Sequence, residues 1–438
     1  METQAIKSLE EYGQLHPADL ADQLQRLPTE EAREILTLLP PWVAAAAVAE
    51  LEPEKAAELL AQLPSEIVTE FLTKLSSAEA ADLAQDLTEH QRTEALADLS
   101  PETSARVNAL LSYPQDTAGG IMSDRFISLR IDQTIQECQQ TLRARSEENV
   151  QDVSYLYVTD ARKKLVGVIS LRDLVFRKPE RRIEEIMNRK VLSVRVDADQ
   201  EEIARQFEHY HYLGLPVVDQ SGALVGVVRA NDIIQVAQDE ATEDMQLMVG
   251  LSGEERALTP WNKSIRTRLP WLLVNLATAF LAAAVVGFFE NTIARWTVLA
   301  IFLPIVAGQG GNAGAQTLTV IIRDLALGEI SRGDGRKALM KEVVLGLANG
   351  LAIGLVVGIF SVIWKGNAIL GLVVGVAMWL NMVAASLSGV LIPFGLKAMR
   401  IDPALASSIF LTTVTDVAGF FFFLGLATLA LHFWGGLI

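Results

Sequence analysis

Residues 409–424 read IFLTTVTDVAGFFFFL, an apolar run typical of the middle of a membrane-spanning helix. Asp416 in this run is the only residue with a formal charge between positions 403 and 438. Because a carboxylate at the bilayer centre costs about 2.5–3.5 kcal/mol on insertion scales, it needs a partner or a water-filled cavity. Thr412 and Thr413, one turn earlier, extend a polar stripe on the same helix face. The pattern predicts a cation site on a conduction path.

The structural alternative is a protonated or salt-bridged Asp416 that only holds helices together. No Lys or Arg lies at a comparable depth in any other apolar segment, so the sequence offers no obvious ion-pair partner. That observation favours the cation pathway.

Charge divides the chain into two parts. The whole chain carries a net charge of −16, whereas residues 1–268 alone hold 28 basic and 46 acidic groups, a net charge of −18. Such acidity argues against nucleic acid as a partner, because phosphates need a basic face. It is compatible with divalent cations and also with a solvated acidic surface. The single cysteine, Cys138, excludes an intrachain disulfide framework and fits a reducing cytosol.

Five segments are apolar and long enough to cross a lipid bilayer, at 269–289, 296–322, 343–364, 369–396 and 404–434. Basic residues gather in alternate connections: Arg323, Arg332, Arg336, Lys337 and Lys341 in one, and Lys397 and Arg400 in another. The positive-inside rule makes these connections cytoplasmic. We therefore expect a multi-pass plasma (inner) membrane protein with cytosolic N-terminus and soluble domains, and with its C-terminus outside. The N-terminus lacks a secretory signal pattern, which agrees with this orientation.

The second apolar segment is interrupted by a polar stretch. Pro304 is followed by GQGGNAGAQ at 308–316, and irregular backbone at membrane depth requires protein or water around it. We interpret the segment as a broken, pore-lining helix in which Asn312 and Gln316 share a face if the helix resumes. The alternative is a small-residue motif for helix packing.

A repeat occupies residues 15–111. Each unit has room for about two helical turns before a breaker, and proline follows most of the repeated leucines within two positions. Self-similarity at a fixed period predicts a superhelix of short helices. The leucines recur every twelve residues, at Leu15, Leu27, Leu39, Leu51, Leu63, Leu75, Leu87, Leu99 and Leu111.

A second duplication follows within residues 122–237. Asp160, the run LVGV at 165–168 and Asp173 reappear 59 positions later as Asp219, LVGV at 224–227 and Asp232. Each copy is predicted as β-α-β-β-α, with a turn between the last two strands and an Asp-capped helix at the end. This pattern resembles a tandem pair of CBS domains, a module that commonly binds adenosyl nucleotides.

The whole chain resembles the MgtE family of magnesium channels. The resemblance is carried by the domain order and by the strings DTAGGIM (116–122), GNAGAQ (311–316) and TTVTD (412–416). The fold class that follows is a multidomain membrane protein with an α-superhelical N-terminal domain, an α/β tandem CBS pair, a connecting helix and a five-span α-helical transmembrane domain. We place these parts at 1–120, 121–180 and 181–237, 238–268, and 269–438, with the connecting helix itself at 236–259.

The resemblance implies a homodimer with its pore on the two-fold axis and the pore carboxylate at Asp416. Thr412 and Asn312 are the further oxygen-bearing residues that we expect along the pore. Mg²⁺ prefers oxygen ligands and gives up water reluctantly, so a ring of two carboxylates can hold it through its hydration shell. Such a site binds weakly enough to release the ion.

The resemblance also implies that cytosolic Mg²⁺ closes the pore by bridging acidic residues of the soluble domains. Each of these residues has a solvated surface carboxylate as its alternative interpretation. The segment Tyr210–Tyr212 holds His and Tyr where a further carboxylate is expected, which leaves the number of regulatory sites open. The matching residues are Asp199, Glu201, Asp232, Glu240, Glu243, Asp244, Asp402, Glu79, Asp82 and Asp86.

ATP is a further possible ligand. Tyr155 could stack on adenine while Arg172 and Asp173 bond the ribose; alternatively, these residues only cap and pack a helix starting at Leu174. The chain has no catalytic constellation, so we expect no enzyme activity. Three other functions compete with Mg²⁺ import: transport of another divalent cation such as Mn²⁺ or Co²⁺, a membrane-anchored nucleotide sensor, and a CBS-bearing anion channel, which Asp416 argues against.

Overall fold

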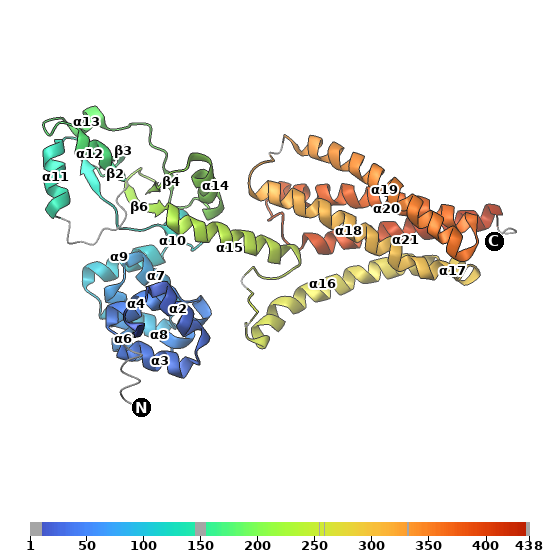
Figure 1. Cartoon of the computed structure of the whole chain (residues 1–438), viewed down its shortest axis with the longest axis horizontal. Helices are drawn as coiled ribbons and strands as arrows, with labels where there is room; N and C mark the ends of the chain where they lie inside the picture. Colours follow the sequence, from blue (N-terminus) through green and yellow to red (C-terminus); the bar gives the residue numbers. More distant parts are fainter. Residues whose placement is uncertain (1–10, 145–154, 254, 258, 331–332, 435–438) are drawn as a thin grey trace. The chain divides into compact units, whose positions relative to one another are not determined.

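The computed structural model describes residues 11–144, 155–253, 255–257, 259–330 and 333–434 (Figure 1). Arg332, one of the basic residues used to predict orientation, lies outside the described residues. The chain divides into two compact units, residues 1–237 and 238–438, and each is described by itself.

Short helices form the first part of unit 1. They are α2 (Pro17–Arg26), α3 (Thr29–Leu38), α4 (Pro41–Ala49), α5 (Pro53–Leu60), α6 (Ser65–Lys74), α7 (Ser77–Asp86), α8 (Glu89–Ala97) and α9 (Pro101–Leu111). Proline stands in the first turn of α2, α4, α5 and α9, where its missing N–H costs no helical hydrogen bond. The predicted superhelix of short helices is therefore confirmed.

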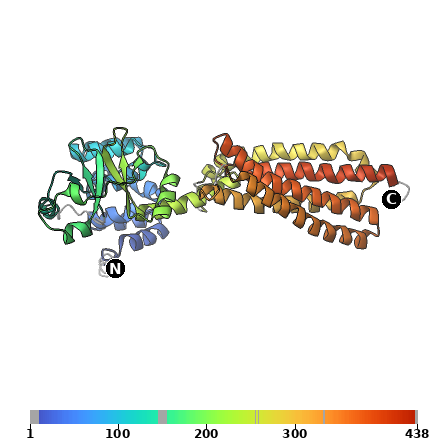
Figure 2. The ribbon, with the colours of Figure 1, turned by 90° about the horizontal axis from the view of Figure 1, so that it is seen from above.

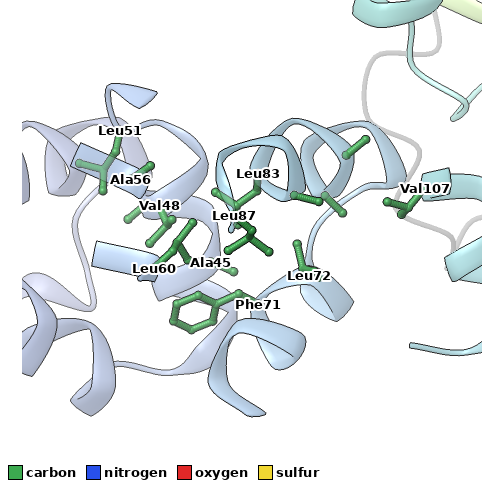
Figure 3. Packing of buried hydrophobic residues seen from close by; sticks show 14 of the residues in the cluster. Ala45, Val48, Leu51, Ala56, Leu60, Phe71, Leu72, Leu83, Leu87 and Val107 are labelled. Carbon is green, nitrogen blue, oxygen red and sulfur yellow. The ribbon is translucent and has the colours of Figure 1, made fainter. Parts of the chain in front are cut away.

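Four of the repeated leucines end helices, and all nine are buried in the core or pack against it. Leu27, Leu39, Leu75 and Leu87 are the C-cap residues of α2, α3, α6 and α7. Figure 3 shows Leu51 and Leu87 from the repeat packed among other buried side chains such as Phe71. Because full burial of one such side chain contributes about 1.5–3 kcal/mol, the repeated leucines stabilise this domain together with the other buried residues of its core.

Two similar α/β modules complete unit 1. The first contains β1 (Ser128–Arg130), α11 (Ile135–Ala144), β2 (Tyr155–Thr159), β3 (Leu165–Ser170) and α12 (Leu171–Phe176), followed by α13 (Ile183–Ile186). The second contains β4 (Val194–Arg195), α14 (Gln200–Tyr210), β5 (Gly214–Val218), β6 (Leu224–Arg229) and α15 (Ala230–Met248).

The strand topology confirms the predicted duplication. Each module is a three-stranded sheet in which the first pair of strands is parallel and the second antiparallel. Even the register shift recurs at equivalent positions, between Val158 and Thr159 and between Val217 and Val218.

Two local predictions in these modules are wrong. Ser170 caps α12 by accepting a hydrogen bond from the backbone N–H of Asp173 at 3.2 Å, so the helix begins at Leu171, and Asp173 lies in its first turn instead of capping it. The connecting helix is α15, which begins at Ala230 and ends at Met248 instead of spanning 236–259 or 238–268. It ends there because Gly250 and Gly253 adopt the left-handed backbone that glycine tolerates, with φ of +80° and +84°.

Short α10 (Ala118–Ile121) joins the superhelix to the second module. The backbone N–H groups of Ala118 and Gly119 donate to the carbonyls of Ala198 (2.7 Å) and Val196 (2.9 Å). A Cβ on Gly120 would lie 2.3 Å from the Pro114 carbonyl oxygen, so the segment 116–122 is tightly packed and has no room for a side chain at Gly120.

Unit 2 consists of long helices that run side by side in both views (Figures 1 and 2). They are α16 (Trp261–Phe288), α18 (Leu299–Ala326), α19 (Gly335–Lys365), α20 (Ala368–Ala398) and α21 (Ser407–Trp434), with short α17 (Glu290–Arg295) between the first two. α20 packs against α18, α19 and α21. Within the described residues, four helices, α16, α19, α20 and α21, are long and apolar enough to cross a membrane.

The sequence predicts five membrane-spanning segments. The remaining one, at 296–322, corresponds to α18, which is not among these four helices. It has 28 residues, as do α16 and α21, but a polar glycine-rich stretch interrupts its apolar residues. The prediction of a broken helix is wrong, because α18 is continuous with Pro304 inside it. Two of its glycines allow close packing: a Cβ on Gly310 would lie 2.2 Å from Asn381 Nδ2, and one on Gly314 would lie 2.7 Å from Leu411.

Candidate functional site

Asp416 lies in the third turn of α21 and is partly exposed. Thr412, one turn earlier, is exposed, and its hydroxyl donates to the Ile409 carbonyl at 3.1 Å. Its oxygen lone pairs therefore remain available as acceptors. Within the described part of the chain, no hydrogen bond or ion pair engages the Asp416 carboxylate. The salt-bridge alternative thus finds no support among these residues.

Thr413 departs from the predicted polar stripe. With Val417 and Phe421 it lines an open apolar groove between α21 and α16, where Leu281 and Val285 form the other wall. Thr412 and Asp416 do not line this groove. The polar face of α21 is therefore narrower than the sequence predicted.

Asn312 and Gln316 are both exposed on α18 and share a face, as predicted for a continuous helix. Gly308 and Gly311 in the same stretch have open space where a Cβ would stand. α18 packs against α21 through Gly314 and Leu411. No hydrogen bond within the described residues joins Asn312 to Asp416.

Sequence reasoning missed Glu342, which is 5% exposed near the start of α19. Its Oε2 accepts from the Thr317 hydroxyl of α18 at 2.8 Å, and its Oε1 lies 3.3 Å from Lys341 Nζ. Hydropathy located the span from 343, whereas the helix begins at Gly335 and turns Glu342 inward. The available signal was an acidic residue directly before an apolar run.

The C-terminal end of α15 is hydrogen-bonded to the start of α21. The backbone N–H of Ala406 donates to the Leu247 carbonyl at 2.8 Å, and the Ser408 hydroxyl donates to the Met248 carbonyl at 2.6 Å. Leu247 and Met248 also pack in one cluster with Leu318 and Ile322 of α18 and Leu411 of α21. Asp402 lies just before this junction and accepts from the Ala404 N–H at 2.6 Å.

A second connection joins α15 to α16. The Gln246 side-chain amide donates to the Glu255 carbonyl (2.7 Å) and accepts from the Glu255 N–H (2.9 Å). Arg268 of α16 donates from Nε to both Glu255 carboxylate oxygens, at 2.8 and 3.0 Å. This hydrogen bonding to Arg268 lowers the pKa of Glu255. Helix α15 is thus tied to both α16 and α21.

The predicted regulatory carboxylates fall into several groups. In unit 1, Glu79, Asp82, Asp86 and Asp232 lie close enough to influence one another. Desolvation, then the charges of Asp86, Glu79 and Asp232, raise the pKa of Asp82 to about 6. Desolvation and Glu54 raise the pKa of Asp86 to about 6. Desolvation also raises the pKa of Asp232, against the opposing charge of Arg229.

Asp199 and Glu201 stabilise the start of α14 through local contacts. The Asp199 carboxylate caps the helix by accepting from the Glu201 N–H at 2.8 Å, and the Glu201 carboxylate lies 3.1 Å from Arg205. In unit 2, Glu240, Glu243 and Asp244 lie on successive turns of α15. The described residues contain no group of three or more His, Cys, Asp or Glu arranged to hold one metal ion.

The three candidate nucleotide residues lie near one another. Tyr155 at the start of β2 pairs with Ser170, the residue that caps α12, and Arg172 and Asp173 follow in the first turn of that helix. Asp173 is already engaged, because the Ser170 hydroxyl donates to its Oδ2 at 2.7 Å and Arg177 lies 3.5 Å away. Tyr155 packs beside Tyr157 and Leu224 between the two modules.

A helical membrane unit with a carboxylate in a long apolar helix, joined by α15 to a pair of CBS-like modules, defines the class of CBS-bearing cation transporters. Family models match residues 303–426 as the MgtE divalent cation transporter, 15–116 as the MgtE intracellular N domain, and 118–180 and 183–239 as CBS domains. The chain belongs to the MgtE family of magnesium transporters, which are not enzymes.

Relatives and solved structures agree. The magnesium transporter MgtE of Thermus thermophilus is 38% identical over 339 residues, which cover 76% of this chain and 74% of that protein. MgtE of Bacillus subtilis is 34% identical, with 75% and 73% covered. The cytosolic domain of the Mg²⁺ channel MgtE in complex with ATP matches at a TM-score of 0.51 and 37% identity, covering 53% of this chain and 98% of that one. The soluble part of a magnesium transporter matches at a TM-score of 0.50 and 31% identity, covering 55% and 96%.

Proposed function

We propose that this protein is a Mg²⁺-selective channel that imports Mg²⁺ across the plasma membrane. The observation that carries the proposal is Asp416, a carboxylate without an ion-pair partner among the described residues, in a chain of the magnesium transporter family. A charge with that placement is most readily explained by a cation and its water shell. Flux of Mg²⁺ into proteoliposomes, followed with an entrapped dye, tests the proposal.

The assembly in this proposal is a homodimer. A single Asp416 offers one carboxylate, whereas a two-fold axis beside α21 would bring a second carboxylate to the same ion. α18 serves as the fifth span, and the N-terminus and both soluble domains are cytosolic, with the C-terminus outside. Mn²⁺ or Co²⁺ remains the second candidate substrate, because carboxylate and water ligands suit those ions as well. Competition by each ion for Mg²⁺ flux distinguishes the two.

Closure by cytosolic Mg²⁺ is the regulatory part of the proposal. The group of Glu79, Asp82, Asp86 and Asp232 concentrates negative charge that a hydrated divalent cation would neutralise. Mg²⁺ keeps several waters in such sites, so carboxylates can bind it without forming a dedicated cage. The two connections of α15, to α16 and to α21, give this charge change a covalent and hydrogen-bonded path to the helix of Asp416.

The regulatory site predicts a pH-dependent response to Mg²⁺. Asp82 and Asp86 have pKa values near 6, above their ordinary value of 3.8, so the folded chain binds these protons more tightly than the unfolded chain. Their ionisation therefore destabilises unit 1 as the pH rises from 3.8 to about 6. Mg²⁺ binds the ionised form, and at a hundredfold excess over Kd it would stabilise by about 2.7 kcal/mol. We expect the increase in Tm with Mg²⁺ to be large at about pH 7.5 and mostly lost at about pH 5.

The matched variants for this measurement are Asp82→Asn with Asp86→Asn, and Asp22→Asn as control. Asp22 is an exposed acid on α2, outside the cluster. The double variant should be more stable than wild type without Mg²⁺ and gain little from Mg²⁺ at the higher pH. Equal Mg²⁺ responses of the double variant and the wild type at that pH would remove these carboxylates from the regulatory site.

We further propose that the CBS pair binds ATP beside Tyr155. Support comes from the ATP complex of a relative's cytosolic domain and from the short separation of Tyr155 from the first turn of α12. An exposed Arg172 can reach a phosphate or ribose, whereas Asp173 is committed to its cap. Calorimetric titration with ATP should show binding that Arg172→Ala weakens, while Arg162→Ala, on an exposed turn, leaves it unchanged. Equal affinities of these two variants would contradict the assignment.

A further inference from the structure

Asn381 is a fully buried amide in the middle of α20, where three helices of the membrane unit meet. Its Nδ2 donates to the Val306 carbonyl of α18 at 2.9 Å. A Cβ on Gly310 of α18 would lie 2.2 Å from this nitrogen, and one on Gly419 of α21 would lie 2.7 Å from it. The amide therefore fills a space that both glycines leave open.

The other half of the amide is unsatisfied. Asn381 Oδ1 is buried and has no hydrogen-bond partner among the described residues. Exchanging the two amide atoms would not help, because Oδ1 would then face the Val306 carbonyl oxygen. An unpaired buried acceptor costs folding free energy that an apolar side chain of similar shape avoids. Stability alone thus does not explain an asparagine at this position.

Its neighbours suggest the reason. Gly419 lies three residues after Asp416 on α21, and Gly310 lies two residues before Asn312 on α18. The contacts of one amide thus fix the distance between the two helices that carry the proposed pore residues. The hydrogen bond to the Val306 carbonyl also fixes the orientation of α20 relative to α18, because hydrogen bonds depend on angle whereas apolar contacts do not.

We propose that Asn381 is a positioning residue of the ion pathway, whose amide holds α18 and α21 at the separation that places the Asp416 carboxylate. The inference rests on the proposed Mg²⁺ transport. Mg²⁺ demands near-ideal octahedral geometry, so a shift of α21 changes how well the carboxylate fits the hydrated ion. The consequence is a change in half-saturating Mg²⁺ and in discrimination between ions, beyond any change in the amount of folded protein.

The test compares full-length wild type with Asn381→Leu, Asn381→Asp, Gly419→Ala and Gly425→Ala in proteoliposomes. Leucine keeps the volume without the hydrogen bond, and Asp keeps the shape but loses the N–H donor, so that it can donate to the Val306 carbonyl only when its carboxyl is protonated. Gly419→Ala pushes the amide, whereas a Cβ on Gly425 of the same helix would meet only Phe289 at 3.9 Å, which makes it the control. Melting temperature, maximal Mg²⁺ flux, half-saturating Mg²⁺ and the ratio of Mg²⁺ to Ca²⁺ flux are measured for each.

We expect Asn381→Leu to melt at or above the wild-type temperature and to change half-saturating Mg²⁺ by about twofold to tenfold, the range that loss of one hydrogen bond produces in an equilibrium. Asn381→Asp and Gly419→Ala should change it similarly, with a lower Mg²⁺ to Ca²⁺ ratio, and Gly425→Ala should match wild type. Adding Asn381→Ala to Gly419→Ala should restore part of the lost stability by making room for the new methyl group.

A merely structural role would lower maximal flux and leave half-saturation and ion ratio unchanged. A folded Asn381→Leu channel with wild-type half-saturation and ion ratio overturns the inference while leaving the proposed transport intact. Absence of Mg²⁺ flux from the wild type itself overturns both.

Discussion

Asp416→Ala should reduce Mg²⁺ flux in proteoliposomes to the background of protein-free vesicles. The substitution removes the carboxylate and its ion together, so no buried charge is left uncompensated and the protein should remain folded. Asp416→Asn keeps the side-chain shape and should still lose most transport, because a neutral amide attracts a hydrated divalent cation much less than a carboxylate does. Initial rates of dye-reported Mg²⁺ entry measure both effects.

The control for this experiment is Glu290→Gln, which removes an exposed acid at the start of α17, outside the long helices. Its flux should equal that of wild type. Gel filtration and melting temperature establish that all three variants are folded. Wild-type flux from Asp416→Ala vesicles would show that the conduction path lies elsewhere.

Local patterns explain why most of the fold could be predicted. The twelve-residue leucines were recognisable because four of the helices, α2, α3, α6 and α7, end at one of them, and proline often follows, so that the period and the stop signals agree. The duplicated strands were recognisable because a turn such as Asp219–Gly222 favours particular residues: Gly222 has φ of +82°, and the Asp219 carboxylate accepts from the Ala223 N–H.

Features that depend on distant partners could not be predicted. A glycine-rich polar stretch either breaks a helix or packs against a neighbour, and only Asn381 and Leu411, far along the chain, decide for packing in α18. Asp82 and Asp232 lie 150 positions apart, and nothing local marks them as neighbours. Hydropathy marks where apolar residues begin and not where a helix begins, which is why Glu342 was assigned to a connection.

The site residues show the same division. Asp416 was recognised because a charge inside an apolar run is conspicuous by itself. Asp199 and Glu201 were selected from resemblance, yet both have local partners at the start of α14, which also accounts for their presence there. A sequence alone does not distinguish an acidic residue that caps a helix from one that binds a metal ion.

Neutralising Glu240, Glu243 and Asp244 together to Gln, Gln and Asn should produce a channel that stays active at millimolar cytosolic Mg²⁺. In the proposed mechanism, Mg²⁺ cancels repulsion between acidic faces and favours the closed state. A ligand shifts such an equilibrium only by its differential affinity, and moving it from 1:99 to 99:1 takes about 5.5 kcal/mol. Several modest sites must act together, so removing three carboxylates from the helix that leads to the pore should weaken closure strongly.

The matched control is the triple variant Glu30→Gln, Glu31→Gln and Glu34→Gln on α3, which removes the same net charge from unit 1 outside the acidic cluster. It should close like wild type. Protease protection of the soluble half should rise with Mg²⁺ in the wild type and in this control, and much less in the α15 variant. Flux is measured as a function of Mg²⁺ on the cytosolic side.

Deleting residues 1–260 is the larger change and should also abolish closure by Mg²⁺. The deletion removes Leu247 and Met248, which cover Leu318 and Leu411 at the junction, so lower stability of the truncated channel is expected as well. Gln246→Ala separates the two effects, because it breaks the paired hydrogen bonds to Glu255 while leaving the soluble domains and their carboxylates in place. We expect this variant to bind Mg²⁺ like wild type, by protease protection, and to close less completely. If the truncated channel instead closes with the wild-type Mg²⁺ dependence, the sensor lies within the membrane unit, and neither the acidic cluster nor the α15 connections control the pore.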